Sequence, residues 1–340
     1  MSEEDVKRNG QEPFCVDEFR PEDAEGMVSL FRAVYGDGYP IRLFYDPEAI
    51  VGANRDGSYY SVVARTPGGR VVGACHLYRS APYAGLYENG VSLVAREYRN
   101  SKIFKELLSY MFNEYIPQKP HIEEAWGEAV CNHLISQKMM LPFRFVETAL
   151  EVALMPVEAY AHEQSAAGRV ATLDAFRCYI PKPHRIYLPP IYEAMLRRIY
   201  DRLGSVRDIA IADKIFPANK ITHAELSVFD FARVARMAVF KSGGDFADCL
   251  AQMENRARKQ NAVVFQVWLN LTEPCVGQAV DILRDRGYFF GGALPRWFDG
   301  DGLLMQKLEC PPDFENIVLL NDFPKELLAF IRKDREDCAG

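Results

Sequence analysis

A short polar turn that carries two cations joins an apolar strand to an amphipathic helix near the end of the first third of the chain. After the apolar run VSLVA, the turn contains Arg99, Asn100, Ser101, Lys102, Ile103 and Phe104. A helix start presents backbone N–H groups without helical partners, and the helix dipole adds partial positive charge there. Asn100 or Ser101 can cap the helix, and Arg99 and Lys102 add charge at the same point. The turn therefore suits a bound phosphate, although solvated cations on an ordinary turn explain the same residues, and no glycine lets the backbone approach an anion closely.

The periodicity of apolar residues predicts the elements that must position this turn. In the first half the order is strand, helix, three strands, helix, strand, helix and strand, which is typical of a mixed α/β sheet with helices on its faces. The predicted strands are residues 14–19, 59–65, 71–80, 87–95, 123–130 and 148–156, and the predicted helices are residues 20–36, 101–112 and 132–141. The stretch 37–58, which contains glycine and proline, is expected to be a loop.

The second half shows a similar succession of strands, helices and a final hairpin, so we expect a duplication of whole domains. Residues 222–240 (two strands), 262–271 and 288–308 (a hairpin) are the predicted strands, and the predicted helices lie within 186–204, 245–261 and 274–287. The predicted domain boundaries are a flexible N-terminus at 1–13, a first domain at 14–158, a linker at 159–172, a second domain at 173–312, and a C-terminal extension with a helix at 313–340.

Composition limits the class of protein. The chain has 340 residues, 49% of them hydrophobic and 26% charged, which is typical of an ordinary globular protein. Its formal net charge of -7 argues against nucleic acid or an anionic membrane as a partner. The eight scattered cysteines include no C-x-x-C pair, so a cytoplasmic protein with reduced thiols and without structural zinc is expected. We find no leader sequence, no apolar run of about 20 residues, no metal-ligand spacing, no P-loop and no nucleophile triad.

In this context the first half resembles the Gcn5-related N-acetyltransferase (GNAT) superfamily, whose loop after the fourth strand follows the pattern Q/R-x-x-G-x-G/A. Arg99 matches the first position, whereas Lys102 and Phe104 stand where glycines are expected. Three further stretches are similar to a branch of tandem acetyltransferase-like proteins, so that the resemblance covers roughly residues 14–310: FRPEDAEGMVSLFRAVYG, EAVCNHLISQK and GYFFGGALPRWFDGDGLLMQKL.

The resemblance implies two tandem GNAT-like domains, of which the second is degenerate, and acetyl-CoA as cosubstrate with no metal. Backbone N–H groups near Leu93, Val94 and Ala95 would polarise the thioester carbonyl. Further cofactor contacts would come from Asn132 and from the residues of the pyrophosphate turn: Arg99, Asn100, Ser101, Lys102, Ile103 and Phe104.

The same resemblance implies the catalytic candidates. An amine must be neutral to attack the thioester, so a general base is useful, and Glu88 at the start of the cofactor strand is the first candidate. Glu128 is the second, and His133 could relay protons, although surface carboxylates and a capping histidine explain these residues equally well. Many relatives place a tyrosine where this chain has Met139, and its absence casts doubt on the general acid. Tyr87 and His76 are distant substitutes.

Two features of the second half stay open. Gly243 and Gly244, in the turn VFKSGGDF, could support an anion, but a degenerate copy that is kept for packing explains them as well. The segment LPRWFDGD could line a cleft, or it could be a packed hairpin with Trp297 in the core.

The predicted function is acetyl-CoA-dependent N-acyl transfer, in which a primary amine attacks directly in a ternary complex. The alternatives are a non-catalytic acyl-CoA-binding or ligand-sensing module and a partner-binding scaffold with the same fold. The sequence identifies neither the acceptor amine nor an oligomeric state.

Overall fold

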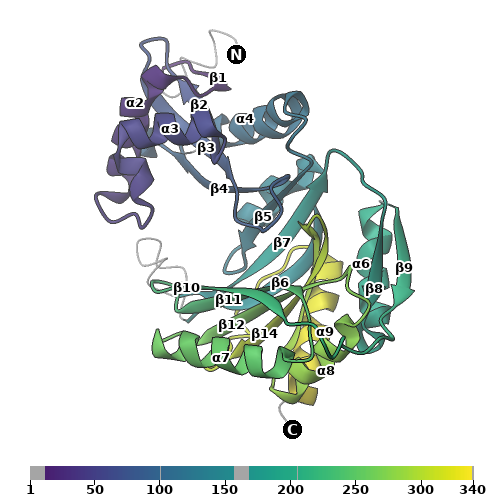
Figure 1. Ribbon diagram of the computed structural model, residues 1–340. Helices are drawn as coiled ribbons and strands as arrows, with labels where there is room; N and C mark the ends of the chain where they lie inside the picture. The colour runs from purple at the N-terminus through teal and green to yellow at the C-terminus, as the bar shows by residue number, and fades with distance from the viewer. Residues whose placement is uncertain (1–11, 100, 157–167, 205, 339–340) are drawn as a thin grey trace. The chain divides into compact units, whose positions relative to one another are not determined.

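The computed structural model describes residues 12–99, 101–156, 168–204 and 206–338 (Figure 1). Contacts among the described residues divide the chain into two compact units. The first comprises residues up to 80 together with 85–125, and the second comprises 81–84 together with the residues from 126 onward. Most of the predicted N-terminal segment 1–13 and of the predicted linker 159–172 lies outside the described residues.

The first unit contains a fully antiparallel sheet in the order β1-β2-β3-β4. Its strands are β1 (Cys15–Glu18), β2 (Tyr59–Arg65), β3 (Val71–Tyr78) and β4 (Leu86–Val94). Its α-helices are α2 (Ala24–Tyr35), α3 (Pro47–Asp56) and α4 (Ile103–Tyr110), and a π-helical turn at Met111–Tyr115 continues α4. The predicted strands and helices of this region are thereby confirmed, with one omission.

The omitted element is α3, because residues 37–58 were expected to be a loop. Asp46 caps α3 by accepting hydrogen bonds from the N–H groups of Glu48 and Ala49, at 2.9 and 3.2 Å. Pro47 occupies the first helical position, and Gly57 ends the helix in the left-handed conformation with φ 76°. The proline and glycine that favoured a loop are therefore helix start and stop signals.

Helices cover both faces of the sheet in the first unit. The ring of His76 on β3 lies 6.2 Å from the ring of Phe31 on α2, so this face carries α2. Gly73, an odd number of residues away, faces the opposite side, where a Cβ atom would approach Ile103 of α4 to 2.7 Å. Glycine at this position lets α4 pack directly on the backbone of β3, which fixes the turn before α4 against the sheet.

The second unit contains a larger sheet in the order β5-β7-β6-β13-β14-β12-β11-β10, and a separate parallel pair, β8 and β9. Its strands are β5 (Glu124–Val130, of which Trp126–Val130 belong to this unit), β6 (Val146–Met155), β7 (Val170–Cys178), β8 (His184–Leu188), β9 (Arg207–Ile211), β10 (His223–Phe229), β11 (Val234–Lys241), β12 (Val264–Asn270), β13 (Phe289–Phe298) and β14 (Gly300–Leu308). Its α-helices are α5 (Ile135–Met140), α6 (Glu193–Leu203), α7 (Phe246–Lys259), α8 (Val276–Asp285) and α9 (Asp322–Cys338).

The core of the second unit lies between this sheet and helices α6 to α9. In Figure 1, α7, α8 and α9 lie along one side of strands β10, β11, β12 and β14. Leu250 of α7, Leu283 of α8 and Leu327 of α9 join the same apolar cluster as Leu150 and Val267 of the sheet. Trp297 is also buried, with its ring centroid 5.0 Å from that of Trp126 and 4.9 Å from that of Trp268. The segment around it is therefore a packed hairpin rather than an open loop.

One arrangement of elements occurs twice in the second unit. In the chain order β5-α5-β6-β7, strand β7 lies between β5 and β6, and in the order β12-α8-β13-β14, strand β14 lies between β12 and β13. Before the second of these arrangements, β11 and β12 form a parallel pair joined through α7. This order recurs within the second unit, and the contacts divide the chain at residue 125, whereas the predicted boundary is at 158.

The predicted linker extends too far toward the C-terminus. Residues 170–172 are part of β7, which lies inside the sheet between β5 and β6. The predicted C-terminal extension contains a helix, as expected, and α9 packs on β6 and β13. Among the residues that the model describes, no helix combines the length and the apolar character needed to cross a bilayer.

Candidate functional site

Glu88, the first candidate base, lies on β4 directly opposite Tyr78 at the end of β3. The Tyr78 hydroxyl donates a hydrogen bond to the Glu88 carboxylate, and only 9% of Glu88 is exposed. A carboxylate and a phenol in direct contact can exchange a proton, and the pair lies at the edge of the core rather than within it. This is the arrangement that a general base requires: a mostly desolvated carboxylate with a fixed orientation.

Aromatic rings surround this pair. The ring of Tyr59 on β2 stacks on that of Tyr78, with centroids 5.3 Å apart, and Phe44 packs edge-on against Tyr59 at 5.6 Å. Burial raises the pKa of Tyr39, and the negative charges of nearby groups, Glu88 among them, raise it further. Burial and then Glu88 likewise raise the pKa of Tyr59. The carboxylate is thus the charged group of an otherwise aromatic surrounding, which suits an organic cation or amine.

The strand that carries Glu88 is distorted three residues further on. His76 pairs with Gly90 and Ala74 pairs with Leu93, so β4 has one more residue than β3 in this interval. This is a β-bulge, and Val91 within it has φ 52°. A β-branched residue at positive φ has a strained backbone. Such strain is common at functional sites, and a bulge redirects the side chains of its strand. The bulge lies between the candidate base and the predicted thioester-binding residues.

The predicted cofactor residues at the end of β4 are partly committed to the sheet. Leu93 and Val94 pair with Ala74 and Gly73, as expected for the last residues of the strand. The N–H of Ala95 donates to the carbonyl of Val72 at 2.9 Å. In this structure the Ala95 N–H is therefore committed to the β3–β4 ladder.

The turn before α4 is ordered by its own side chains. The N–H of Ser101 donates to the carbonyl of Tyr98 at 2.9 Å, and Ser101 Oγ accepts the N–H of Ile103 at 3.2 Å. Arg99 and Lys102 are exposed, and neither side chain forms an ion pair within the described part of the chain. Phe104 is half-buried on α4, and Asn100 lies outside the described residues. Two side-chain cations thus stand at the helix start, while two of its amides already have partners.

The two suggested substitutes for the missing tyrosine are buried. His76 is fully buried, contacts Ser61 Oγ at 2.8 Å, and burial lowers its pKa to about 3. Tyr87 is also fully buried, accepts a hydrogen bond from Arg79 and donates one to the carbonyl of Gly57. Neither residue can reach a substrate, so neither is a candidate for the general acid.

The remaining predicted residues lie in the second unit. Glu128 on β5 is half-buried, 3.4 Å from a guanidinium nitrogen of Arg236. His133 Nδ1 accepts the N–H of Ile135 at 3.3 Å at the start of α5, and Asn132 lies beside it in the same half-buried turn. This bond orders the turn that leads into α5.

The glycine-containing turn of the second unit is covered by its own chain. The N–H of Gly243 donates to Thr222 Oγ1 at 3.0 Å, and the N–H of Gly244 donates to the carbonyl of Lys220 at 3.1 Å. A Cβ atom at Gly243 would lie 2.1 Å from that Lys220 oxygen. An anion could use these two donors only by displacing the segment 220–222, so the glycines serve packing in this structure.

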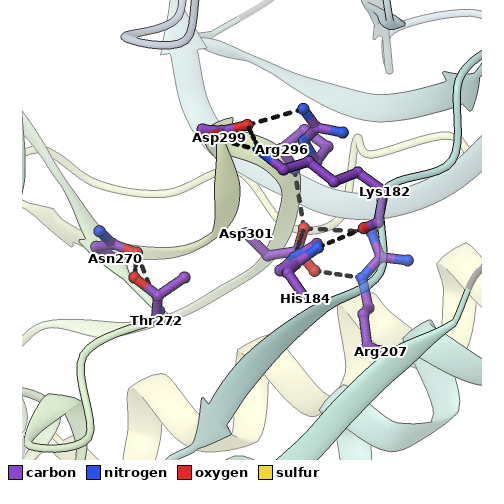
Figure 2. Close-up of polar contacts among 8 residues, drawn as sticks. All are labelled: Lys182, His184, Arg207, Asn270, Thr272, Arg296, Asp299 and Asp301. Carbon is purple, nitrogen blue, oxygen red and sulfur yellow. Dashed lines mark hydrogen bonds and ion pairs between the residues drawn. The ribbon is translucent and has the colours of Figure 1, made fainter.

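A second charged cluster surrounds Asp301 on β14 (Figure 2). Asp301 is fully buried and receives Arg207 Nε at 2.5 Å and the N–H of Arg296 at 2.9 Å, while His184 Nε2 lies at 3.2 Å. Burial opposes its charge, but Arg207 and His184 outweigh that effect and hold the pKa of Asp301 well below its usual range. Lys182 and Arg296 both contact Asp299 nearby. Ion pairs thus connect these charged residues around the β13–β14 hairpin.

His184 makes the stability of this cluster depend on pH. Its Nδ1 faces the carbonyl of Lys182 at 2.8 Å and its Nε2 faces Asp301, so two acceptors favour the doubly protonated ring. Burial disfavours the charge, but the bond to Asp301 prevails and raises the pKa of His184 above 6.5.

We therefore expect the stabilisation from the His184 charge to be fully present below about pH 6.5 and to be lost as the pH rises through the higher folded-state pKa. The His184→Gln variant should be less stable than the wild type by about 1–2 kcal/mol at pH 6, and this difference should shrink by pH 9. Urea unfolding at several pH values measures it. A difference that does not vary with pH would show that the histidine is uncharged throughout.

Tyr78 is the partner of Glu88 that the sequence did not identify. It ends β3 and faces Glu88 because the connection between β3 and β4 sets their register, with Tyr78 opposite Glu88 and Leu77 opposite Asn89. Antiparallel pairing of two predicted strands across the connection 79–85 was the available signal, but the length of that connection does not by itself fix their register.

Comparisons with known proteins find solved structures with a similar fold, but no match to a family model or to a curated protein. Similar solved structures include the ribosomal-protein-S5-alanine acetyltransferase of Vibrio fischeri, with 11% identity and a TM-score of 0.39 over 49% of this chain and 94% of that one. Mutant forms of the spermidine/spermine N-acetyltransferase of Vibrio cholerae match with 11% identity and a TM-score of 0.38, over 49% and 95% of the two chains. An N-acetyltransferase of Staphylococcus aureus Mu50 matches with 12% identity and a TM-score of 0.37, over 49% and 98%. At such scores the likeness carries no conclusion about activity, substrate or cosubstrate.

Proposed function

We propose that the chain is an acetyl-CoA-dependent N-acyltransferase that transfers an acetyl group to a primary amine, with Glu88 as general base. The observation that carries the proposal is the Glu88–Tyr78 pair, which is desolvated, surrounded by aromatic rings and placed on a bulged strand that leads to a cationic turn. The sequence resemblance to the GNAT superfamily supports the same reaction.

Each residue of the pair has a definite task in this reaction. Acetyl-CoA supplies the acetyl group as an activated thioester. Glu88 takes the proton that the amine loses as its nitrogen forms the new C–N bond, and the C–S bond breaks with CoA leaving as a thiolate that regains a proton. Tyr78 donates its hydroxyl hydrogen to the Glu88 carboxylate and keeps it oriented. Tyr39 and Tyr59, near the same carboxylate, would pack against the acceptor amine.

Arg99 and Lys102 are proposed to hold the pyrophosphate of acetyl-CoA. We expect Arg99→Ala to weaken acetyl-CoA binding by about tenfold or more, because a charge-assisted hydrogen bond to phosphate is worth about 1.5–3 kcal/mol. Titration calorimetry measures the affinity. Lys105→Ala, which removes an exposed cation one turn into α4, is the matched control and should bind as the wild type does. Equal affinities of Arg99→Ala and the wild type would remove this turn from the proposed site.

We further propose that the chain consists of two tandem GNAT-like domains, of which the second binds no acetyl-CoA. The repeated order of β5-α5-β6-β7 and β12-α8-β13-β14 supports the duplication. The bonds from Gly243 and Gly244 to segment 220–222 support the loss of binding. One equivalent of acetyl-CoA per chain is the expected stoichiometry, and two equivalents would contradict it.

We propose a cytoplasmic location because the cysteine thiols are free. None of the eight cysteines, all of which the model describes, forms a disulfide. Free thiols, several of them buried, suit a reducing compartment.

A non-catalytic acyl-CoA sensor is the second candidate function. The observation that favours it is the commitment of amides around the cationic turn, at Ala95, Ser101 and Ile103, to bonds within the chain. Binding of acetyl-CoA with background release of CoA across a panel of primary amines would favour the sensor. Release above background with any amine would favour the enzyme.

A further inference from the structure

Three carboxylates from three different strands meet on one face of the sheet in the second unit. Glu128 lies on β5, Glu151 on β6 and Asp174 on β7, and one carboxylate oxygen from each lies within 4.8 Å of the others. Asp174 and Glu151 are at most 1% exposed. The face is not the one that the helices cover, because the neighbours Ala129, Leu150 and Leu173 belong to the helix-covered core and successive side chains alternate between faces.

The guanidinium of Arg236 lies beside this cluster. Arg236 on β11 places Nη2 3.4 Å from Glu128 and 3.3 Å from Glu151, and its Nε donates to Gln266 Oε1 at 2.9 Å. The three carboxylates lie close enough to repel one another, and the Arg236 contacts to Glu128 and Glu151 offset part of that repulsion. Buried charges of one sign either take up protons or bind a cation, because the low dielectric makes their mutual repulsion costly.

An independent observation points to a ligand in this cluster. Thr172 is 1% exposed, and its hydroxyl makes no hydrogen bond with any residue that the model describes. The register of β6 and β7 places Thr172 directly opposite Glu151, and Asp174 lies two residues along on the same face, so the hydroxyl points into the acidic cluster. The side-chain Nε2 of Gln266, which is fully buried, is unbonded within the described chain as well. A buried hydroxyl without a partner costs about 1–3 kcal/mol, so a ligand that engages it would be stabilising.

We propose that Glu128, Glu151, Asp174 and Thr172 form a binding site for a hard divalent cation, independent of the proposed acetyl transfer. A point within about 2.8 Å of all three carboxylate oxygens exists, since their separations do not exceed 4.8 Å and 4.8/√3 is about 2.8. This is close to the distances of about 2.3–2.6 Å at which Ca²⁺ binds oxygen, and longer than the about 2.0–2.1 Å that Mg²⁺ demands. A divalent ion offsets the repulsion among the three carboxylates, and the Thr172 oxygen supplies a fourth protein ligand. Because each carboxylate has a second oxygen, Arg236 can keep its contacts while the ion is bound.

The test is a metal titration of the full chain after treatment with EDTA, with Ca²⁺, Mn²⁺ and Mg²⁺ added separately. Thermal unfolding is followed by tryptophan fluorescence, because all three tryptophans of the chain lie in the second unit. We expect a rise in Tm of about 5 °C when the best ion is present at roughly 100 times its Kd. Arg236 lies 5.4 Å above the ring of Trp268, so the emission should change on binding.

Three variants separate a metal site from a buried ion network. Asp174→Asn should fold without metal at least as stably as the wild type, since it removes one of the repelling charges, and should lose the metal-dependent rise in Tm. Thr172→Val keeps the shape, so it should leave the metal-free Tm unchanged or raised and make the metal-dependent rise smaller. The control Asp281→Asn, an exposed position on α8, should respond to metal as the wild type does.

The proposal is overturned if none of the three ions changes Tm, or if the rise is the same in Asp174→Asn as in the wild type. It is also overturned if Thr172→Val is less stable than the wild type without metal and shows an equal rise with it, because the hydroxyl would then have a structural partner. Activity is not used as a readout, so failure of the acetyl-transfer proposal leaves this test intact.

Discussion

The Glu88→Gln variant is expected to lower kcat/KM for acetyl transfer by about 10²–10⁴, because glutamine keeps the shape and the acceptor oxygen of Glu88 but cannot take the proton of the amine. CoA release with a reactive amine, measured across pH, gives the rate. The wild type should lose activity as the pH falls through the pKa of its base, and the variant should lack this dependence.

Binding separates this loss from damage to the fold. Acetyl-CoA affinity and Tm of Glu88→Gln should match the wild type, because the cationic turn lies beyond the end of β4. Tyr78→Phe removes the hydroxyl that orients the carboxylate and should reduce kcat less than Glu88→Gln does, while shifting the pH profile. Glu97→Gln, an exposed carboxylate of the same unit that pairs with Arg70, is the matched control. Full activity of Glu88→Gln would remove Glu88 as the base.

The Asp301→Asn variant is expected to destabilise the second unit by about 3–5 kcal/mol, because it leaves Arg207 and His184 without their shared counter-charge in a buried position. Urea unfolding followed by tryptophan fluorescence measures this change for the second unit alone, since no tryptophan lies in the first.

An exposed neighbour provides the control. Asp299 contacts Lys182 and Arg296 but has a side chain that is 46% exposed, so Asp299→Asn should cost no more than about 1 kcal/mol. The double variant Arg207→Ala with Asp301→Asn should be more stable than the sum of its single changes predicts, by about 0.5–3 kcal/mol. Additive changes, or a cost of Asp301→Asn below 1 kcal/mol, would show that the buried pair does not act as a unit.

Most of the strands could be predicted from apolar alternation, whereas the helix α3 and the strands β7, β8 and β9 were missed. The helix α3 was missed because Pro47 and Gly57 resemble loop residues, although they mark its first and last turns. Strand β7 was not predicted: its residues 170–172 were assigned to the linker, and Thr172 and Asp174 interrupt its apolar pattern. Those two residues are also members of the proposed cation site, and polar groups at such sites weaken the local pattern that predicts a strand.

The sequence identified individual site residues on single strands, but it did not predict the contacts between residues of different strands. Glu88 was identified from its position on the strand before the turn, whereas its contact with Tyr78 depends on the register of β3 and β4, which the connection 79–85 leaves open in the sequence. Glu128 was identified as a possible base, and its neighbours Glu151 and Asp174 were not, because the three carboxylates lie on separate strands with no ligand spacing in the sequence. Contacts across a sheet between distant segments carry no short-range signal.

The packing at Gly243 also bears on how phosphate-binding turns are found in sequences. A search that ranks strand-to-helix turns by glycine content would place the turn at 241–246 above the one at 99–104. The contacts reverse that order, because Gly243 and Gly244 are held against Lys220 and Thr222 of the chain itself, while the glycine-free turn keeps two exposed cations at its helix start. Since any side chain at Gly243 would collide with the Lys220 carbonyl, selection for folding alone would retain this glycine in related chains. Its retention there would be evidence of packing and not of a bound nucleotide.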